Sequence, residues 1–92
     1  MKKLLIILGL IISVNATDCD YAYNKATYYS NITSKGTLDT KENACKQADA
    51  LEQLVNWMGT MEQSCPNFSS KYGTVYELNK KMLVIAVSKC GH

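Results

Sequence analysis

The chain has 92 residues, enough for one small domain, and a formal net charge of +2. The two excess positive charges are Lys2 and Lys3, and an uninterrupted apolar run follows them. Val14 and Ala16 place apolar or small side chains at the −3 and −1 positions of a cleavage site, so the pattern predicts a cleavable signal peptide over residues 1–16. The apolar run is shorter than the ~18 residues that a membrane-spanning helix needs.

Cleavage after Ala16 leaves one domain, residues 17–92, in which eight Lys balance eight Asp and Glu. A net charge of zero argues against a basic nucleic-acid binder, a polybasic membrane-surface module and an acidic tail. We therefore expect no nucleic-acid partner, no stable membrane span after cleavage, and a periplasmic or secreted location.

Four cysteines lie in this domain: Cys19, Cys45, Cys65 and Cys90. An even number of cysteines in a short exported chain predicts two disulfides. A metal site or a redox pair is the alternative, but no Cys-x-x-Cys spacing is present, and both chemistries usually favour that spacing. Because the core of so small a domain contributes only a few kcal/mol, the disulfides are expected to be structural.

The first predicted helix covers about residues 19–33. Thr17 and Asp20 resemble an N-terminal cap, and Gly36 provides the end. Apolar side chains recur every three or four residues between them, which is the helical period.

The second predicted helix begins at the capping box Asp39-Thr-Lys-Glu42 and ends before Pro66. One broad apolar face runs along it. Gly59 is its weak point, because glycine lowers helix stability by about 1 kcal/mol relative to alanine, and it could mark a bend or an early end.

The third predicted helix starts after a cap at Asn67 or Ser69 and ends at Cys90, with Gly91 behind it. Its apolar residues form two rows, so we expect the helix to be covered on more than one side. The first row is Val75, Leu78, Met82 and Ile85, and the second is Tyr72, Tyr76, Leu83, Val87 and Cys90. The run 83–87 alone would also suit a buried strand, but no partner strand is evident.

The pairing of the cysteines follows from treating the second and third helices as an antiparallel hairpin. Cys45 and Cys90 then both lie ~33 Å from the turn at ~1.5 Å per residue, whereas Cys65 lies at the turn and reaches neither. This predicts Cys45–Cys90 and, by elimination, Cys19–Cys65. The second pair fits less well, since Cys19 and Cys65 would lie ~25 Å and ~43 Å from the first turn. An extended lead-in, a longer crossing loop or a helix end near Gly59 would have to absorb the difference.

The expected fold is therefore all-α: a small three-helix bundle, or a helical hairpin plus an N-terminal helix, stapled by two disulfides. We expect no enzyme and no cofactor. The one histidine is His92 at the chain end, the sequence has no Arg and no phosphate-binding Gly-rich loop, and its carboxylates alternate with lysines as on ordinary helix surfaces.

Three methionines give a weak alternative. Met58 and Met61 lie one turn apart, Met82 could face them, and thioethers are ligands for Cu(I). Methionine at core spacing more often fills gaps in packing, so the sequence favours a core role over a metal site.

Aromatic residues are more informative. Tyr21, Tyr28 and Ile32 line a second face of the first helix, and Trp57 projects away from the apolar face of the second. Exposed Tyr and Trp often anchor protein interfaces, although Tyr is also common at the rim of a core. The working hypothesis is an exported, non-enzymatic module that binds another protein: an inhibitor, an immunity or exclusion factor, or an accessory subunit of an envelope system. The alternatives are a small-ligand or copper carrier with a methionine-lined cavity, and a structural envelope component that self-associates through the second row of the third helix.

Overall fold

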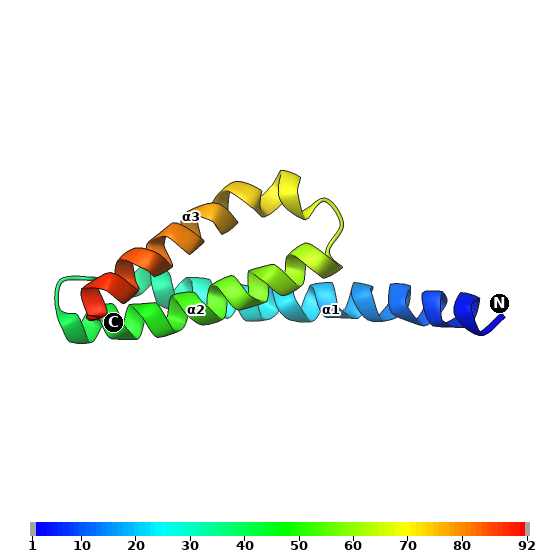
Figure 1. Cartoon of the computed structure of the whole chain (residues 1–92), viewed down its shortest axis with the longest axis horizontal. Coiled ribbons are helices and arrows are strands. Elements are labelled where there is room, and N and C mark those ends of the chain that lie inside the picture. Colours follow the sequence, from blue (N-terminus) through cyan, green and yellow to red (C-terminus); the bar gives the residue numbers. More distant parts are fainter. Residues whose placement is uncertain (1, 92) are drawn as a thin grey trace.

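The computed structural model describes residues 2–91, and the side chains of residues 18–91. Its three helices are α1 (Lys2–Lys35), α2 (Lys41–Ser64) and α3 (Phe68–Cys90), and no strand occurs within the described chain (Figure 1). Connections 36–40 and 65–67 are short, so consecutive helices run antiparallel. The all-α prediction is confirmed.

The central element is α2. It packs against both α1 and α3, whereas the Cα atoms of α1 and α3 never come within 8 Å of each other in the described part of the chain. The two outer helices therefore diverge over one side of α2 and do not close into a tight bundle (Figure 1). Of the two predicted architectures, a helical hairpin with an N-terminal helix laid along it describes the arrangement better.

The first helix does not start where the sequence predicted. In the full chain α1 is continuous from Lys2, so the backbone amides near residue 19 lie inside the helix, where they need no N-terminal cap. The cap predicted at Thr17 and Asp20 is therefore wrong for the full chain. The side chains of the predicted signal peptide, residues 1–16, lie outside the described residues. The predicted end is confirmed, because α1 stops at Lys35 and the amide of Gly36 donates to the Thr33 carbonyl at 3.2 Å.

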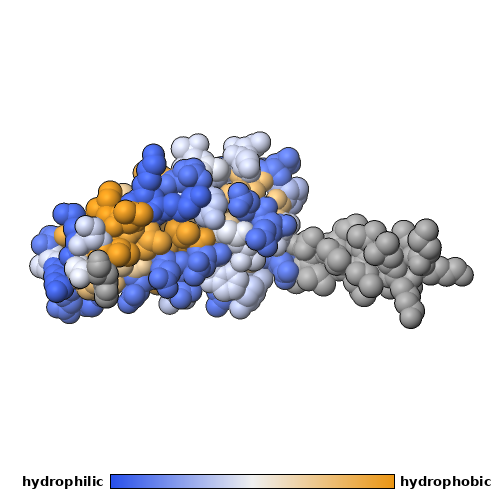
Figure 2. Space-filling model, viewed as in Figure 1, coloured by the Kyte–Doolittle hydropathy of each residue, from blue (hydrophilic) through white to orange (hydrophobic). Residues whose placement is uncertain are grey.

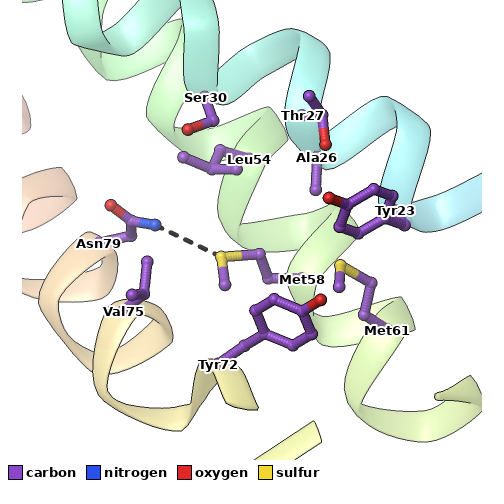
Figure 3. Close-up of a pocket in the computed structure, with 10 residues that line it drawn as sticks. All are labelled: Tyr23, Ala26, Thr27, Ser30, Leu54, Met58, Met61, Tyr72, Val75 and Asn79. Carbon is purple, nitrogen blue, oxygen red and sulfur yellow. Dashed lines mark hydrogen bonds between the residues drawn. The ribbon is translucent and has the colours of Figure 1, made fainter.

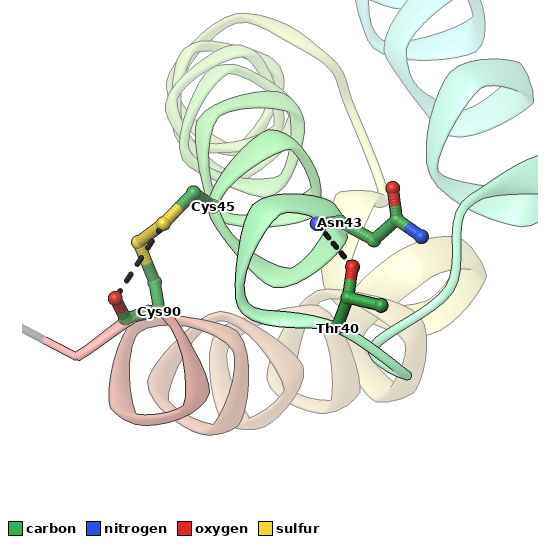
Figure 4. Close-up of a disulfide and its surroundings, with 4 residues drawn as sticks. All are labelled: Thr40, Asn43, Cys45 and Cys90. Carbon is green, nitrogen blue, oxygen red and sulfur yellow. Dashed lines mark hydrogen bonds between the residues drawn. A yellow bond between two sulfur atoms is a disulfide. The ribbon is translucent and has the colours of Figure 1, made fainter.

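The cap of α2 is Thr40, one residue after the predicted Asp39. Thr40 has extended backbone, and its hydroxyl accepts from the Asn43 amide at 3.0 Å (Figure 4). Asp39 instead accepts from the Asn43 side chain at 2.9 Å and from the Thr37 hydroxyl at 2.7 Å. These hydrogen bonds, that of Asn43 first, lower the pKa of Asp39 below its ordinary value of 3.8. The N-cap of α2 therefore lies one residue after the predicted position, and Asp39 stabilises the turn before α2 through its two hydrogen bonds.

Helix α2 runs through Gly59 without interruption and ends at Ser64, before Pro66. The bend considered at Gly59 does not occur. A Cβ atom at this position would lie 3.3 Å from the Tyr76 hydroxyl, so the missing side chain leaves room for α3 to pack closely there. The packing of Tyr76 over Gly59 compensates for the low helix propensity of glycine.

The third helix begins after Asn67, which takes a left-handed conformation at φ 59° and makes no side-chain cap. Asparagine tolerates this region better than most residues, and its carbonyl accepts the Lys71 amide at 3.2 Å. Ser69 lies inside the helix. The predicted end is confirmed: Gly91 is left-handed at φ 92°, and its amide donates to Ser88.

Both predicted disulfides are present. Cys19 bonds to Cys65 with their Cα atoms 4.9 Å apart, and Cys45 bonds to Cys90 with theirs 4.7 Å apart (Figure 4). The apparent mismatch of the first pair is absorbed by the crossing loop. Gln47, six residues into α2, donates from Nε2 to the Thr33 carbonyl at 2.7 Å, so α2 starts well beyond the end of α1.

Counted from this contact, both chain paths to the disulfide are similar, because ~21 Å of α1 separates Thr33 from Cys19 and ~27 Å of α2 separates Gln47 from Cys65.

The core is built around α2, with α1 and α3 packing against it. Its buried residues form one cluster: Ala22, Ala26, Ala48, Leu51, Leu54, Met58, Met61, Phe68 and Ala86. Four alanines on the inner faces allow the helices to approach closely. Gln47 is the one buried polar residue among the described side chains.

One of the two apolar rows of α3 is covered, whereas in the other row only Met82 packs against the core. Tyr72, Tyr76, Leu83 and Val87 pack against the core, and Cys90 is in a disulfide. Val75, Leu78 and Ile85 of the other row are 49%, 55% and 43% exposed. The expectation of cover on more than one side is therefore wrong, because α3 packs along one side only, and the second row is the one that faces the core. Figure 2 also shows hydrophobic surface gathered over the C-terminal half of α3, where Val84 is 69% exposed.

Candidate binding surfaces

Two surfaces of α1 are of interest, and they lie on different sides of the helix. The first we call the aromatic face: Tyr21, Lys25, Tyr28 and Ile32 of α1 with Trp57 of α2. The α1 residues are spaced by four, three and four positions, which aligns them along one side of the helix. Tyr21, Tyr28 and Ile32 are 54%, 59% and 41% exposed.

The two helices contribute jointly to the aromatic face. Tyr21 meets Trp57 edge to face, with ring centroids 5.4 Å apart and an interplanar angle of 78°. The Lys25 ammonium lies 5.5 Å from the Tyr21 ring centroid, in range for a cation–π contact. Trp57 is half-buried against the core, so it fixes the position of the more exposed Tyr21.

Tyr28 and Ile32 extend the aromatic face towards the C-terminal end of α1. Tyr28 stacks edge to face on Tyr29 at 5.0 Å, and Tyr29 packs against the core. Tyr28 is therefore supported from beneath while its outer surface remains exposed. The structure thus brings Tyr21 and Trp57 into contact and places Tyr28 and Ile32 about two and three helical turns beyond Tyr21.

The second surface is a groove where the side chains of all three helices meet, with a volume of about 150 Å³ (Figure 3). Tyr23 of α1 and Tyr72 of α3 approach across it, with ring centroids 6.3 Å apart. Its lining has no ionisable group other than these phenols and consists of Tyr23, Ala26, Thr27, Ser30, Leu54, Met58, Met61, Tyr72, Val75 and Asn79. We call it the methionine groove.

Two of the three predicted methionines, Met58 and Met61, line this groove, and Met82 does not. The Met58 sulfur already accepts from the Asn79 side-chain amide at 3.3 Å (Figure 3). Because Met82 belongs to the first row of α3 and packs at the edge of the core, the three thioethers do not form one ligand set.

Sequence reasoning missed Tyr23, Tyr72 and Asn79 as groove residues. One signal was available for Asn79: it follows Tyr72 by seven positions and precedes Leu83 by four, so it is an amide on the core-facing side of α3. The two tyrosines could not be distinguished from core residues, because their position depends on how far α1 and α3 diverge.

The charged residues show the pattern of ordinary helix surfaces. Lys46 pairs with Glu42 at 3.5 Å and Lys80 with Glu77 at 2.8 Å, all on exposed helix surfaces. The hydrogen bond that the Lys80 ammonium donates to the Glu77 carboxylate raises the pKa of Lys80 above its ordinary value. Among the described side chains no group of three His, Cys, Asp or Glu residues could hold a metal ion. His92 lies outside the described residues.

Within the residues described, no helix is both long and apolar enough to cross a membrane. The two disulfides are typical of proteins that fold in an oxidising, extracellular environment. Comparison of the chain with protein-family models, curated proteins and solved structures found no match.

Proposed function

We propose that the protein is an exported, non-enzymatic module that binds another protein through the aromatic face. Such modules include inhibitors, immunity or exclusion factors, and accessory subunits of envelope systems. The observation that carries the proposal is the exposed Tyr21, held against the half-buried Trp57 and continued along α1 by the exposed Tyr28 and Ile32. Tyr and Trp contribute large contact areas at low cost in conformational entropy, and they dominate binding energy at protein interfaces.

Rigidity of the aromatic face also supports this function. Tyr21 follows the disulfide-bonded Cys19 by two residues, and Trp57 rests on the core of α2. Binding a partner would therefore order few additional side chains, which reduces the entropic cost of association. Lys25 within the face would favour a partner that offers a carboxylate beside an apolar surface.

The experiment compares capture of envelope or secreted proteins by three forms of the protein. These are the wild type, a variant with Tyr21→Ala, Tyr28→Ala and Trp57→Ala, and a control that replaces two exposed apolar residues of α3, Leu78→Ala and Val84→Ala. A partner of the aromatic face is retained by the control and lost by the first variant. With that partner purified, we expect affinity to fall by at least ~30-fold, as for loss of a hot spot. Identical capture by all three forms would disprove the proposal.

Location follows from the same proposal. A signal peptide over residues 1–16, followed by two disulfides, favours a periplasmic or secreted protein. Protein isolated from its own host should then have a mass that corresponds to a chain starting at Thr17. A mass that includes the leader would contradict cleavage there.

The methionine groove supports a second candidate function, a carrier of a small ligand. Its volume of about 150 Å³ suits a neutral molecule of benzene size, and the Tyr, Ser, Thr and Asn groups could bind one polar substituent. Native mass spectrometry of protein from its own host should show the added mass of such a ligand. Protein mass alone would argue against a carrier, and absence of Cu(I) binding tighter than micromolar in a titration would exclude copper as its cargo.

A further inference from the structure

The uncovered row of α3 is flanked by lysines. Lys71, Val75, Leu78, Met82, Ile85 and Lys89 are spaced by four, three, four, three and four positions, so they lie along one side of the helix. Aliphatic side chains occupy the middle of this row and a lysine stands at each end. About 27 Å of helix separates the two lysines at ~1.5 Å per residue.

Charge is distributed unevenly among the helices. Helix α3 contains four Lys and one Glu, a net charge of +3, whereas α2 contains two Lys and four Asp or Glu, a net charge of −2. The single acidic residue of α3, Glu77, pairs with Lys80. Among the described side chains, Lys71, Lys81 and Lys89 are exposed and form no ion pair. The balanced total charge therefore conceals one basic helix, and zero net charge does not exclude a basic surface.

Lys81 extends this surface beyond the row. It lies three positions after Leu78 and four before Ile85, and three before Val84, which is 69% exposed. Apolar and basic side chains are thus mixed over a broad surface of α3. We call this surface the arc, and it consists of Lys71, Val75, Leu78, Lys81, Met82, Val84, Ile85 and Lys89. The backbone of α3 approaches that of α2 alone, and the aromatic contact of α3 with α1 is made by Tyr72, which lies outside this arc. No other helix in the described part of the chain therefore covers the arc.

We propose that this arc docks on the surface of an anionic phospholipid bilayer. Aliphatic side chains of the row would enter the headgroup boundary, and Lys71, Lys81 and Lys89 would extend to lipid phosphates. A second copy of the chain is a poorer occupant. Antiparallel pairing of two rows would set Lys71 against Lys89, and parallel pairing would set each lysine against itself, so like charges meet in both cases.

The test is co-sedimentation with vesicles of phosphatidylcholine alone and of phosphatidylcholine with phosphatidylglycerol at 3:1. Binding is expected only to the anionic vesicles, and it should weaken as NaCl rises from 50 to 500 mM. Replacing Lys71, Lys81 and Lys89 by Gln should lower the partition coefficient by about 100-fold, from the loss of three surface charges. The lysines are exposed, so this variant keeps the fold.

The matched control is Lys35→Gln, Lys41→Gln and Lys46→Gln, which removes the same charge from other surfaces. It should bind anionic vesicles nearly as well as the wild type. If both triple variants lost vesicle binding to the same extent, the protein would be attracted by its net charge alone. If both kept their binding, the contact would lie elsewhere in the chain, the leader included. Either result overturns the proposal. Absence of vesicle binding by the wild type also overturns it and would favour an acidic protein as the occupant of the arc.

Discussion

Gln47 is the residue on which the register of α1 and α2 depends. It is buried, and its amide satisfies the carbonyl of Thr33 in the last turn of α1. Gly36 is what allows this contact, because a Cβ atom there would overlap the Gln47 side-chain oxygen. The backbone of Gly36 is not left-handed, so the requirement for glycine here is one of space.

Gly36→Ala should therefore lower the free energy of unfolding by about 1–2 kcal/mol, since Gln47 must move and its buried amide loses the hydrogen bond to the Thr33 carbonyl. In a Gln47→Ala background the same substitution should cost little, because the obstructed side chain is gone. Urea unfolding of the four proteins of this double-mutant cycle measures the coupling.

Gly73→Ala serves as the control for the effect of alanine itself. A Cβ atom at Gly73 has 4.0 Å to its nearest neighbour, and the residue lies inside α3, so stability should rise by up to about 1 kcal/mol. Additive costs of Gly36→Ala and Gln47→Ala would contradict the contact.

The sequence predicted Gly36 as a helix end, and that is correct. It could not predict the link to Gln47, because the two positions belong to different helices and their meeting depends on how far α2 extends past α1. The aromatic face was predicted better. Its α1 residues share one helical row, so their alignment follows from spacing alone, whereas the contact of Tyr21 with Trp57 required the tertiary structure.

At the scale of the helices, prediction succeeded where a local signal defines the boundary. Gly36, Pro66 and Gly91 each predict the end of a helix, and the three helices end just before these residues. Starts were less certain, because Asp39 and Thr40 are both good caps and only the structure shows which one bonds to the Asn43 amide. The two rows of α3 were equally apolar, so the sequence could not decide which one would face α2.

Thr40→Ala should lower the free energy of unfolding by about 1 kcal/mol, the usual cost of losing an N-cap. The Asn43 amide loses its acceptor, and the first turn of α2 should exchange its amide hydrogens faster. Thr74→Ala is the matched control, since Thr74 is exposed within α3 and alanine is the better helix former there. A stability change of the same sign and size in both variants would disprove the capping role.

For the whole molecule, the disulfides were predicted correctly because regular helical rise places Cys45 and Cys90 at matching heights, and Cys19–Cys65 then follows by elimination. Each closes a long loop, with sequence separations of 46 and 45 residues. In the loop-entropy account each is worth about 4 kcal/mol. The two should therefore contribute almost equally.

Replacing Cys19 and Cys65 by Ala, or Cys45 and Cys90 by Ala, should each lower the free energy of unfolding by about 3–4 kcal/mol. Removing all four should leave a chain that is largely unfolded at 37 °C, because a core of this size contributes little more than that amount. Thermal unfolding followed by circular dichroism distinguishes these forms. If the variant without any of the four cysteines were as stable as the wild type, packing alone would suffice to hold the fold.

The two disulfides also interlock along the chain, since Cys45 lies inside the loop closed by Cys19–Cys65, and Cys65 lies inside the loop closed by Cys45–Cys90. Every peptide bond between Cys19 and Cys90 thus belongs to at least one covalent ring. A protease that cuts any one of these bonds, whether in a connection or in a helix, leaves all fragments joined in a single molecule. A single cut between Cys19 and Cys90 would thus nick this protein without releasing any part of it.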